Sequence, residues 1–151
     1  MSSVRLVTEQ LEDELIPAIN RAVGIYIITS FVMESGVRLL KPHLKRAAER
    51  NAEIQILAGD YLHITQPSAL RLLLEMGKGV EVRMWKSGGS SFHAKAYLFD
   101  YGQDEGLLIV GSSNMSKSAY RDGFEWNLTV NAGKEPFTFQ HALEVFQKSF
   151  Y

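Results

Sequence analysis

The chain has 151 residues, of which 46% are hydrophobic and 22% are charged, and it contains no cysteine. This length and composition are typical of one globular domain, and they exclude disulfide bonds and thiolate metal sites. The net charge of −1 argues against a protein that binds nucleic acid with its whole surface, so any attraction for phosphate must come from a local site.

The first half of the chain alternates between helical and strand patterns. Apolar residues at helical spacing predict helices over Thr8–Val23, Ser35–Asn51 and Ser68–Met76. Thr8 is the expected cap of the first helix. A short apolar run rich in β-branched residues predicts a buried strand over Ile25–Ile28. Further strands are predicted over Glu53–Ala58 and over Val80–Trp85, where apolar and polar residues alternate. This β-α-β-α-β order predicts a parallel sheet with helices on its faces.

The second half begins with the clearest loop of the sequence, residues 86–91. Strands are then predicted over Phe92–Phe99 and Leu107–Gly111, and a six-residue polar turn, Tyr101–Gly106, joins them into a hairpin. A further strand over Phe124–Val130 and a last helix ending at Phe150 follow.

The predicted elements indicate an α/β fold: a mixed, largely parallel β-sheet flanked by helices on both faces. We expect one domain over residues 1–151. The chain ends on the apolar pair Phe150-Tyr151, which is also consistent with further domains in a longer native chain.

His93, Lys95 and Tyr97 alternate along the strand predicted over Phe92–Phe99, so their side chains share one face. A histidine beside a lysine has no advantage in a core. A phosphate group, however, favours the pair, because lysine binds phosphate as a point charge and neutral histidine is a nucleophile or base. Asp100 lies at odd spacing from His93, off this face, which favours a turn-capping or local orienting role.

Two further segments carry polar side chains to the neighbouring strands. Gly111-Ser112-Ser113-Asn114 follows the partner strand of the hairpin, where backbone N–H groups, hydroxyls and an amide can point at an anion. Glu125 lies in an otherwise apolar strand and is either a surface charge or a carboxylate that orients a histidine ring. Trp85 and Trp126 are expected in the core rather than as platforms for bases.

These residues resemble the signature of the phospholipase D superfamily, which is His-x-Lys, four residues, Asp, a variable gap and Gly-Ser-x-Asn. Here the signature reads His93-Ala94-Lys95, then Asp100, then Gly111-Ser112-Ser113-Asn114, and Glu125 matches the acidic residue that follows in the family. The resemblance covers about Phe92 to Asn127 and implies a phospholipase D-like fold. The gap after Asp100 is longer than is common in the family, and the extra residues fall in the polar turn.

The resemblance also implies a mechanism and a partner. His93 would attack phosphorus and form a phosphohistidine, while Lys95 and Asn114, with Ser112 as a weaker candidate, would bind the phosphate oxygens. Family members need two motif copies, so a chain with one full copy is expected to act as a homodimer. No metal and no other cofactor is expected.

The substrate predicted from these features is the backbone of DNA or RNA, because short members of the family that dimerise are often nucleases. A phospholipid is the alternative within the same chemistry, although no amphipathic membrane-binding helix supports it. A nucleic-acid-binding module of a larger helicase or restriction protein is the alternative outside catalysis. Without a signal peptide or an apolar run of roughly 20 residues, we expect a cytoplasmic protein that is not membrane-bound.

Overall fold

A computed structural model describes residues 2–60, 64–85 and 92–151, so the predicted loop at 86–91 lies outside the described residues. Within these ranges, seven strands form one sheet in the order β1-β7-β6-β5-β2-β3-β4. The strands are β1 (Val4–Val7), β2 (Gly24–Thr29), β3 (Glu53–Gly59), β4 (Val80–Trp85), β5 (Ala96–Gly102), β6 (Glu105–Gly111) and β7 (Asn127–Asn131). The helices are α1 (Glu12–Arg21), α2 (Glu34–Glu49), α3 (Pro67–Leu74), the short π-helical turn η2 (Ser118–Asp122) and α4 (Pro136–Phe150).

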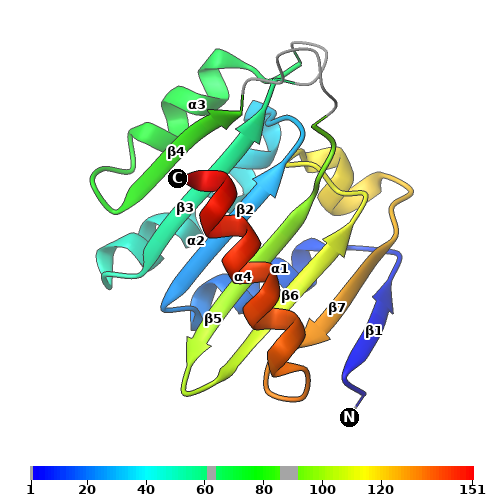
Figure 1. The fold of residues 1–151 in the computed structure, drawn as a ribbon. Coiled ribbons are helices and arrows are strands. Elements are labelled where there is room, and N and C mark those ends of the chain that lie inside the picture. Colours follow the sequence, from blue (N-terminus) through cyan, green and yellow to red (C-terminus); the bar gives the residue numbers. More distant parts are fainter. Residues whose placement is uncertain (1, 61–63, 86–91) are drawn as a thin grey trace.

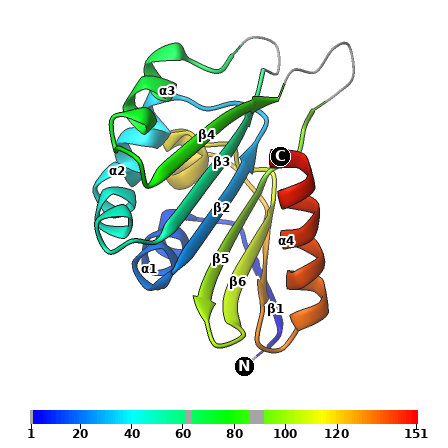
Figure 2. The same ribbon diagram turned by 60° about the vertical axis from the view of Figure 1, so that its left-hand side comes forward.

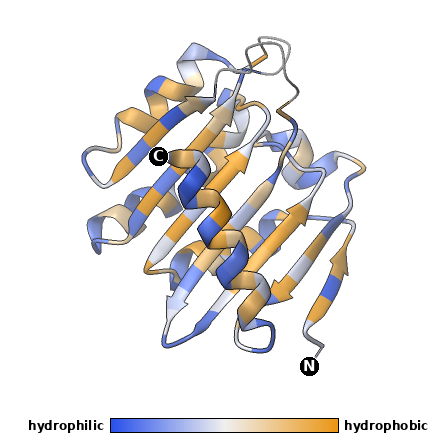
Figure 3. Ribbon diagram, in the orientation of Figure 1, coloured by the Kyte–Doolittle hydropathy of each residue, from blue (hydrophilic) through white to orange (hydrophobic). Residues whose placement is uncertain are grey.

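Helices cover both faces of the sheet, as the sequence predicts. Figures 1 and 2 show α1, α2 and α3 on one face and α4 alone on the other. The first three helices bury apolar residues such as Leu15, Leu40 and Leu73 in one core cluster, whereas α4 buries Phe139 and Phe146 in a second cluster. The central strands β2 and β3 are buried on both faces, and Figure 3 shows hydrophobic residues along most of the strands. The α/β fold and the mixed sheet are therefore confirmed.

Parallel pairing makes up a smaller share of the sheet than predicted. Only the pairs β2–β3 and β3–β4 are parallel among the described strands. The pairs β2–β5, β5–β6, β6–β7 and β1–β7 are antiparallel. The βαβ rule applies only where a helix crosses over between neighbouring strands. After β4 the chain instead crosses to the other side of β2, where β5 pairs antiparallel with β2, and β6 and β7 then each pair antiparallel with the strand before them.

Several element boundaries differ from the prediction. The edge strand β1 was not predicted, because a period-2 pattern over four residues with Arg5 in the middle is too short to recognise. Helix α1 begins at Glu12 without a side-chain cap, so Thr8 does not cap it. Strand β5 begins at Ala96 and β7 at Asn127, which leaves the chain at His93 and Glu125 in extended segments just before the strands.

The β5–β6 hairpin closes more tightly than the six-residue turn that was predicted. Both strands extend toward the turn, and Gly102 pairs with Glu105. Gln103 and Asp104 lie between them with φ of 55° and 64°, the positive values that a two-residue type I′ turn requires. The hairpin fixes the register of β5 against β6, and therefore the position of the residues at its open end.

No helix within the described part of the chain is long and apolar enough to cross a membrane.

Candidate active site

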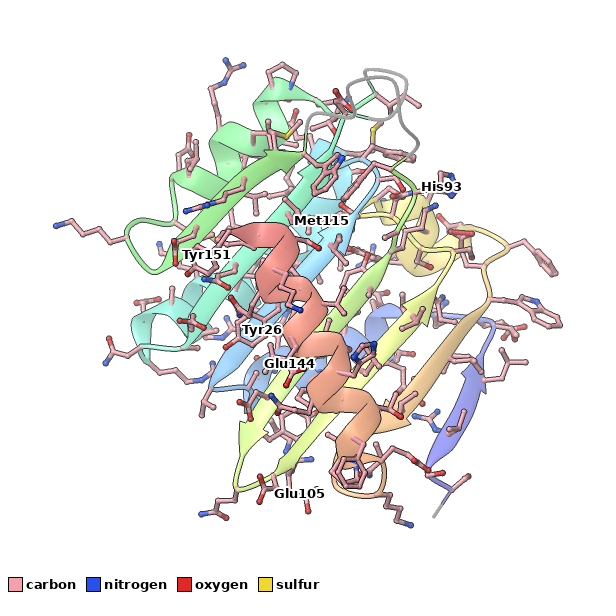
Figure 4. The ribbon with its side chains drawn as sticks, in the orientation of Figure 1. Tyr26, His93, Glu105, Met115, Glu144 and Tyr151 are labelled. Atoms are coloured by element: carbon pink, nitrogen blue, oxygen red, sulfur yellow. The ribbon has the colours of Figure 1, made fainter. Side chains whose placement is uncertain are left out.

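The signature residues gather at one end of the sheet. His93 and Lys95 come directly before β5, and the Gly111–Asn114 segment begins at the last residue of its neighbour β6. The Gly111 N–H donates to the Lys95 carbonyl at 3.3 Å, which ties the two segments together. Figure 4 shows His93 and Met115 toward this end and Glu105, the first residue of β6, at the opposite end.

His93 and Lys95 are in direct contact. The Lys95 ammonium donates to His93 Nδ1 at 2.7 Å and to the His93 carbonyl at 2.8 Å, and it lies 3.1 Å from Nε2. The His93 side chain is exposed, whereas Lys95 is only 7% exposed. Burial lowers the pKa of Lys95, and the charge of Glu125 partly opposes this shift. An accessible imidazole beside a sheltered cation is the arrangement that attack on an anionic phosphate needs.

Buried polar side chains form hydrogen bonds to the Gly111–Asn114 segment and hold it in place. The Tyr97 hydroxyl donates to the Ser113 carbonyl at 2.8 Å and lies 3.0 Å from the Tyr120 hydroxyl. Asn127 Nδ2 donates to the Ser113 hydroxyl at 2.9 Å. Burial raises the pKa values of both tyrosines, so these hydroxyls stay protonated. The alternation of His93, Lys95 and Tyr97 placed Tyr97 on the correct face, and strand alternation also placed the polar Asn127 on one face with Glu125, but Tyr120 carried no signal.

Asn114 connects the segment to the end of β2. Its side-chain oxygen accepts hydrogen bonds from the backbone N–H groups of Ser30 at 2.8 Å and Phe31 at 3.2 Å. Because the oxygen is engaged in this way, the amide nitrogen is the part of Asn114 that is directed away from the β2–α2 connection. The side chain can therefore offer N–H donors to a phosphate oxygen, although its role there stays a prediction.

Glu125 and Ser112 form a polar pair beside Lys95. The Ser112 hydroxyl donates to Glu125 Oε2 at 3.2 Å and accepts from the Trp126 N–H at 3.1 Å. The Ser112 N–H in turn donates to the Trp126 carbonyl at 3.1 Å. Glu125 is thus positioned by Ser112, and its charge acts on Lys95; orientation of the His93 ring by Glu125 stays a prediction.

Asp100 lies far from this cluster. It is inside β5, and its carboxylate accepts a hydrogen bond from the Gly102 N–H at 2.8 Å. Seven residues of extended chain separate it from His93 by roughly 20 Å. The contacts support the turn-holding role and not a role among the catalytic residues.

The other histidines and the tryptophans have different surroundings. His43-Leu44-Lys45 repeats the His-x-Lys spacing, but it lies on α2, where residues two apart do not share a face, and the His43 ring contacts Arg46 at 2.8 Å. Trp85 stacks on Phe92 with 5.1 Å between ring centroids, as expected for a packed residue. The prediction that Trp126 lies in the core is wrong, because its side chain is exposed.

Among the residues that the structure describes, no group of three histidine, aspartate or glutamate side chains is arranged to hold a metal ion. His63 lies outside the described residues.

The sequence matches the family model described as "Cardiolipin synthase, PLD-like domain" over residues 15–149. The chain belongs to the phospholipase D-like family. The match includes every residue of the signature, so the resemblance seen from Phe92 to Asn127 extends over nearly the whole domain. The sequence has no significant match among curated proteins.

Solved structures show the same fold. NucT from Helicobacter pylori is 21% identical with a TM-score of 0.74, and the alignment covers 97% of this chain and 94% of that one. Nuc from Salmonella typhimurium, a phospholipase D family member, is 18% identical with a TM-score of 0.70, covering 97% and 93%. Phosphatidylserine synthase from Haemophilus influenzae is 15% identical with a TM-score of 0.71, covering 97% of this chain and 37% of that one. At these identities the likeness concerns the phospholipase D-like fold.

The electrostatic link between Glu125 and Lys95 gives a testable expectation. Burial lowers the pKa of Lys95 and the Glu125 charge raises it, so Glu125→Gln removes the opposing effect. We expect the pKa of Lys95 to lie below that of an exposed lysine in the native protein and to fall further in the variant. Lysine side-chain NMR over a pH titration measures both values, with Lys95→Met to assign the signal. Glu105→Gln, at the far end of the sheet, is the matched control. An unchanged or increased Lys95 pKa in Glu125→Gln contradicts the coupling.

Proposed function

We propose that this protein is a metal-independent phosphodiesterase that cleaves a nucleic-acid backbone through a phosphohistidine intermediate. The observation that supports it most is the contact between exposed His93 and buried Lys95, set against the Gly111–Asn114 segment at one end of the sheet. The phospholipase D-like family assignment supports the same chemistry.

The proposed reaction has two steps. In the first, an unprotonated ring nitrogen of His93 attacks phosphorus, the bond from phosphorus to the leaving oxygen breaks, and a second histidine gives its proton to that oxygen. In the second step the same histidine takes a proton from water, which attacks phosphorus and releases His93. Lys95 and the amide N–H groups of Asn114 stabilise the charge on the nonbridging oxygens. Ser112 is a further donor at the edge of the site, and Glu125 holds it.

The decisive assay is incubation of the purified protein with excess chelator and three substrates: a labelled oligonucleotide, a phospholipid and bis(p-nitrophenyl) phosphate. We expect turnover of the oligonucleotide and the small diester in chelator, because a lysine and neutral donors supply the charge stabilisation. Loss of activity in chelator with recovery in magnesium contradicts the proposed mechanism. Turnover of the phospholipid alone would instead favour a phospholipid phosphodiesterase. This alternative is included because the matching family model is described as a cardiolipin synthase domain and because phosphatidylserine synthase has a similar fold.

The second histidine is proposed to come from a second copy of the chain. The full signature occurs once in the sequence, and the His-x-Lys spacing at His43 lies on α2. A two-fold dimer that brings two His93 side chains together would complete one site from two identical halves.

A strip of exposed apolar side chains supports this homodimer. Leu6, Leu128 and Val110 lie side by side across β1, β7 and β6, and all three are exposed. They share the face of Leu108 and Val130, which pack in the α4 cluster, so the strip lies beside α4. It begins next to the site, since Val110 precedes Gly111. A second copy placed on this strip would cover apolar surface of the kind that marks interfaces between proteins.

Mixing variants tests the shared site. When wild-type protein exchanges subunits with a ninefold excess of His93→Ala protein, about one tenth of the wild-type chains find a wild-type partner. If both histidines are needed, activity per wild-type chain therefore falls about tenfold after exchange, relative to the same mixture before exchange. A monomer by solution mass, or activity that follows simple dilution, contradicts the homodimer. The test uses the full-length native protein, so that any second histidine carried elsewhere in the chain is included.

A further inference from the structure

Two large aromatic side chains project into solvent beside the candidate active site. Phe124 is 88% exposed and Trp126 is 57% exposed. Both lie in the segment between η2 and β7, outside any helix or strand. Exposure of this kind leaves apolar ring faces in water, which costs free energy unless a ligand or partner covers them.

The backbone places these rings one strand beyond the phosphate-binding segment. Ser112 and Trp126 exchange two hydrogen bonds, and Gly111 is bonded to Lys95 on the other side. Neighbouring strands lie about 4.8 Å apart, so Trp126 is roughly 10 Å from Lys95 across the sheet. That separation suits a nucleotide next to the one whose phosphate is attacked. Glu125, between the two aromatic residues in the sequence, accepts a hydrogen bond from the Ser112 hydroxyl.

The charge of the chain favours stacking over a broad basic surface as the source of affinity for nucleic acid. The net charge is −1, and Arg121, which precedes this segment, is paired with Glu12 at 2.8 Å. A protein without a broad basic surface can still hold a nucleic acid by stacking bases on exposed rings, because every base has a flat face. Base faces are available in this way only where the strand is unpaired, since in a duplex they are covered by their neighbours.

We propose that Phe124 and Trp126 bind unpaired bases that flank the scissile phosphate, and that the substrate is single-stranded nucleic acid. The inference rests on the proposed nuclease function and specifies its substrate. The aromatic pair differs from the strip of Leu6, Leu128 and Val110, which is aliphatic and lies within the strands. An alternative occupant of the rings, the second copy of the chain, is separated by the experiment below.

The experiment replaces each ring while keeping the backbone contacts. The hydrogen bonds between Trp126 and Ser112 use only backbone atoms of Trp126, so Trp126→Ala removes the ring without removing them. Trp126→Leu keeps apolar bulk without a flat face, and Trp126→Phe keeps a ring. Phe137→Ala is the matched control, because Phe137 is 89% exposed and lies at the start of α4, away from the site.

Binding is measured by anisotropy of a labelled single-stranded oligonucleotide in a His93→Asn background, and turnover is measured with the same oligonucleotide and with bis(p-nitrophenyl) phosphate. We expect Trp126→Ala and Trp126→Leu each to weaken oligonucleotide binding about tenfold. The ratio of kcat/KM for the oligonucleotide to that for the small diester should fall by a similar factor. Trp126→Phe should restore most of the loss, Phe124→Ala should act like Trp126→Ala, and Phe137→Ala should have no effect. An oligonucleotide with abasic sites beside the cleaved bond should bind wild type and Trp126→Ala equally.

Three results would overturn the inference. The first is unchanged oligonucleotide binding in Trp126→Ala. The second is a duplex bound as tightly as the single strand and with the same sensitivity to Trp126. The third is a lowered solution mass in Trp126→Ala with normal behaviour in Trp126→Leu, which would assign the rings to the contact between copies. If the proposed function itself is wrong, the result is distinct from these three, because the wild-type protein then turns over neither the oligonucleotide nor the small diester.

Discussion

Replacing His93 with Asn is expected to lower kcat for bis(p-nitrophenyl) phosphate by at least about 10⁴-fold, the size of effect seen when a nucleophile that acts as one unit with its base is removed. Asn keeps a polar side chain of similar size next to Lys95 but cannot form a phosphorus–nitrogen bond of the same kind. In the proposed dimer the variant also loses the proton donor to the leaving oxygen, so both halves of the reaction fail together. Because the His93 side chain is exposed, its loss is expected to leave the unfolding temperature nearly unchanged.

His141→Asn is the matched control, because His141 is an exposed histidine on α4, outside the site. It should retain wild-type turnover. Rapid quenching of the wild-type enzyme with a labelled diester should trap a phosphoenzyme whose label maps to His93. Near-normal turnover of His93→Asn, or a label on another residue such as His63, would contradict the assignment of the nucleophile.

The sequence predicted the elements with long apolar patterns and missed those defined by pairing. Residues 53–58 and 80–85 were recognised as strands because continuous or alternating apolar residues reveal burial, and both strands exist with nearly these bounds. The share of antiparallel pairing was missed because strand direction depends on how the chain returns after β4. Strand β1 was missed because its four-residue pattern is too short to recognise, and only its pairing with β7 defines it as a strand.

The candidate site was also predicted only in part. Features that follow from the local spacing of residues were predicted, whereas contacts between residues far apart in the sequence were not. Spacing alone placed His93 beside Lys95 and brought the Gly111–Asn114 segment next to them, and the structure has both. Spacing could not show that the Asn114 oxygen is occupied by the backbone of Ser30 and Phe31, because that contact joins residues more than eighty positions apart. Nor could it show that Trp126 is exposed, since large apolar residues are more often buried.

The burial of Lys95 affects both the stability of the fold and the proposed chemistry. Its ammonium is held in a buried position where burial lowers its pKa, so the charged form is less stable there than in water. A core would gain by replacing it with an apolar side chain of similar length. A buried cation next to an exposed histidine is therefore what we expect at a site where stability is given up for function.

Lys95→Met is therefore expected to lower the catalytic activity without lowering the stability of the fold. Without the cation, negative charge that develops on the phosphate oxygens is left uncompensated, and kcat should fall by about 10³-fold, near 4 kcal/mol of transition-state stabilisation. The unfolding temperature should stay the same or rise, because the variant no longer buries an ammonium. The matched control is Lys117→Met, an exposed lysine on the segment after Asn114, which should change neither property. Differential scanning calorimetry and steady-state kinetics on the same preparations provide the comparison. A Lys95→Met protein that loses activity only in proportion to a lower unfolding temperature would make Lys95 a structural residue, and one that keeps its activity would remove it from the site.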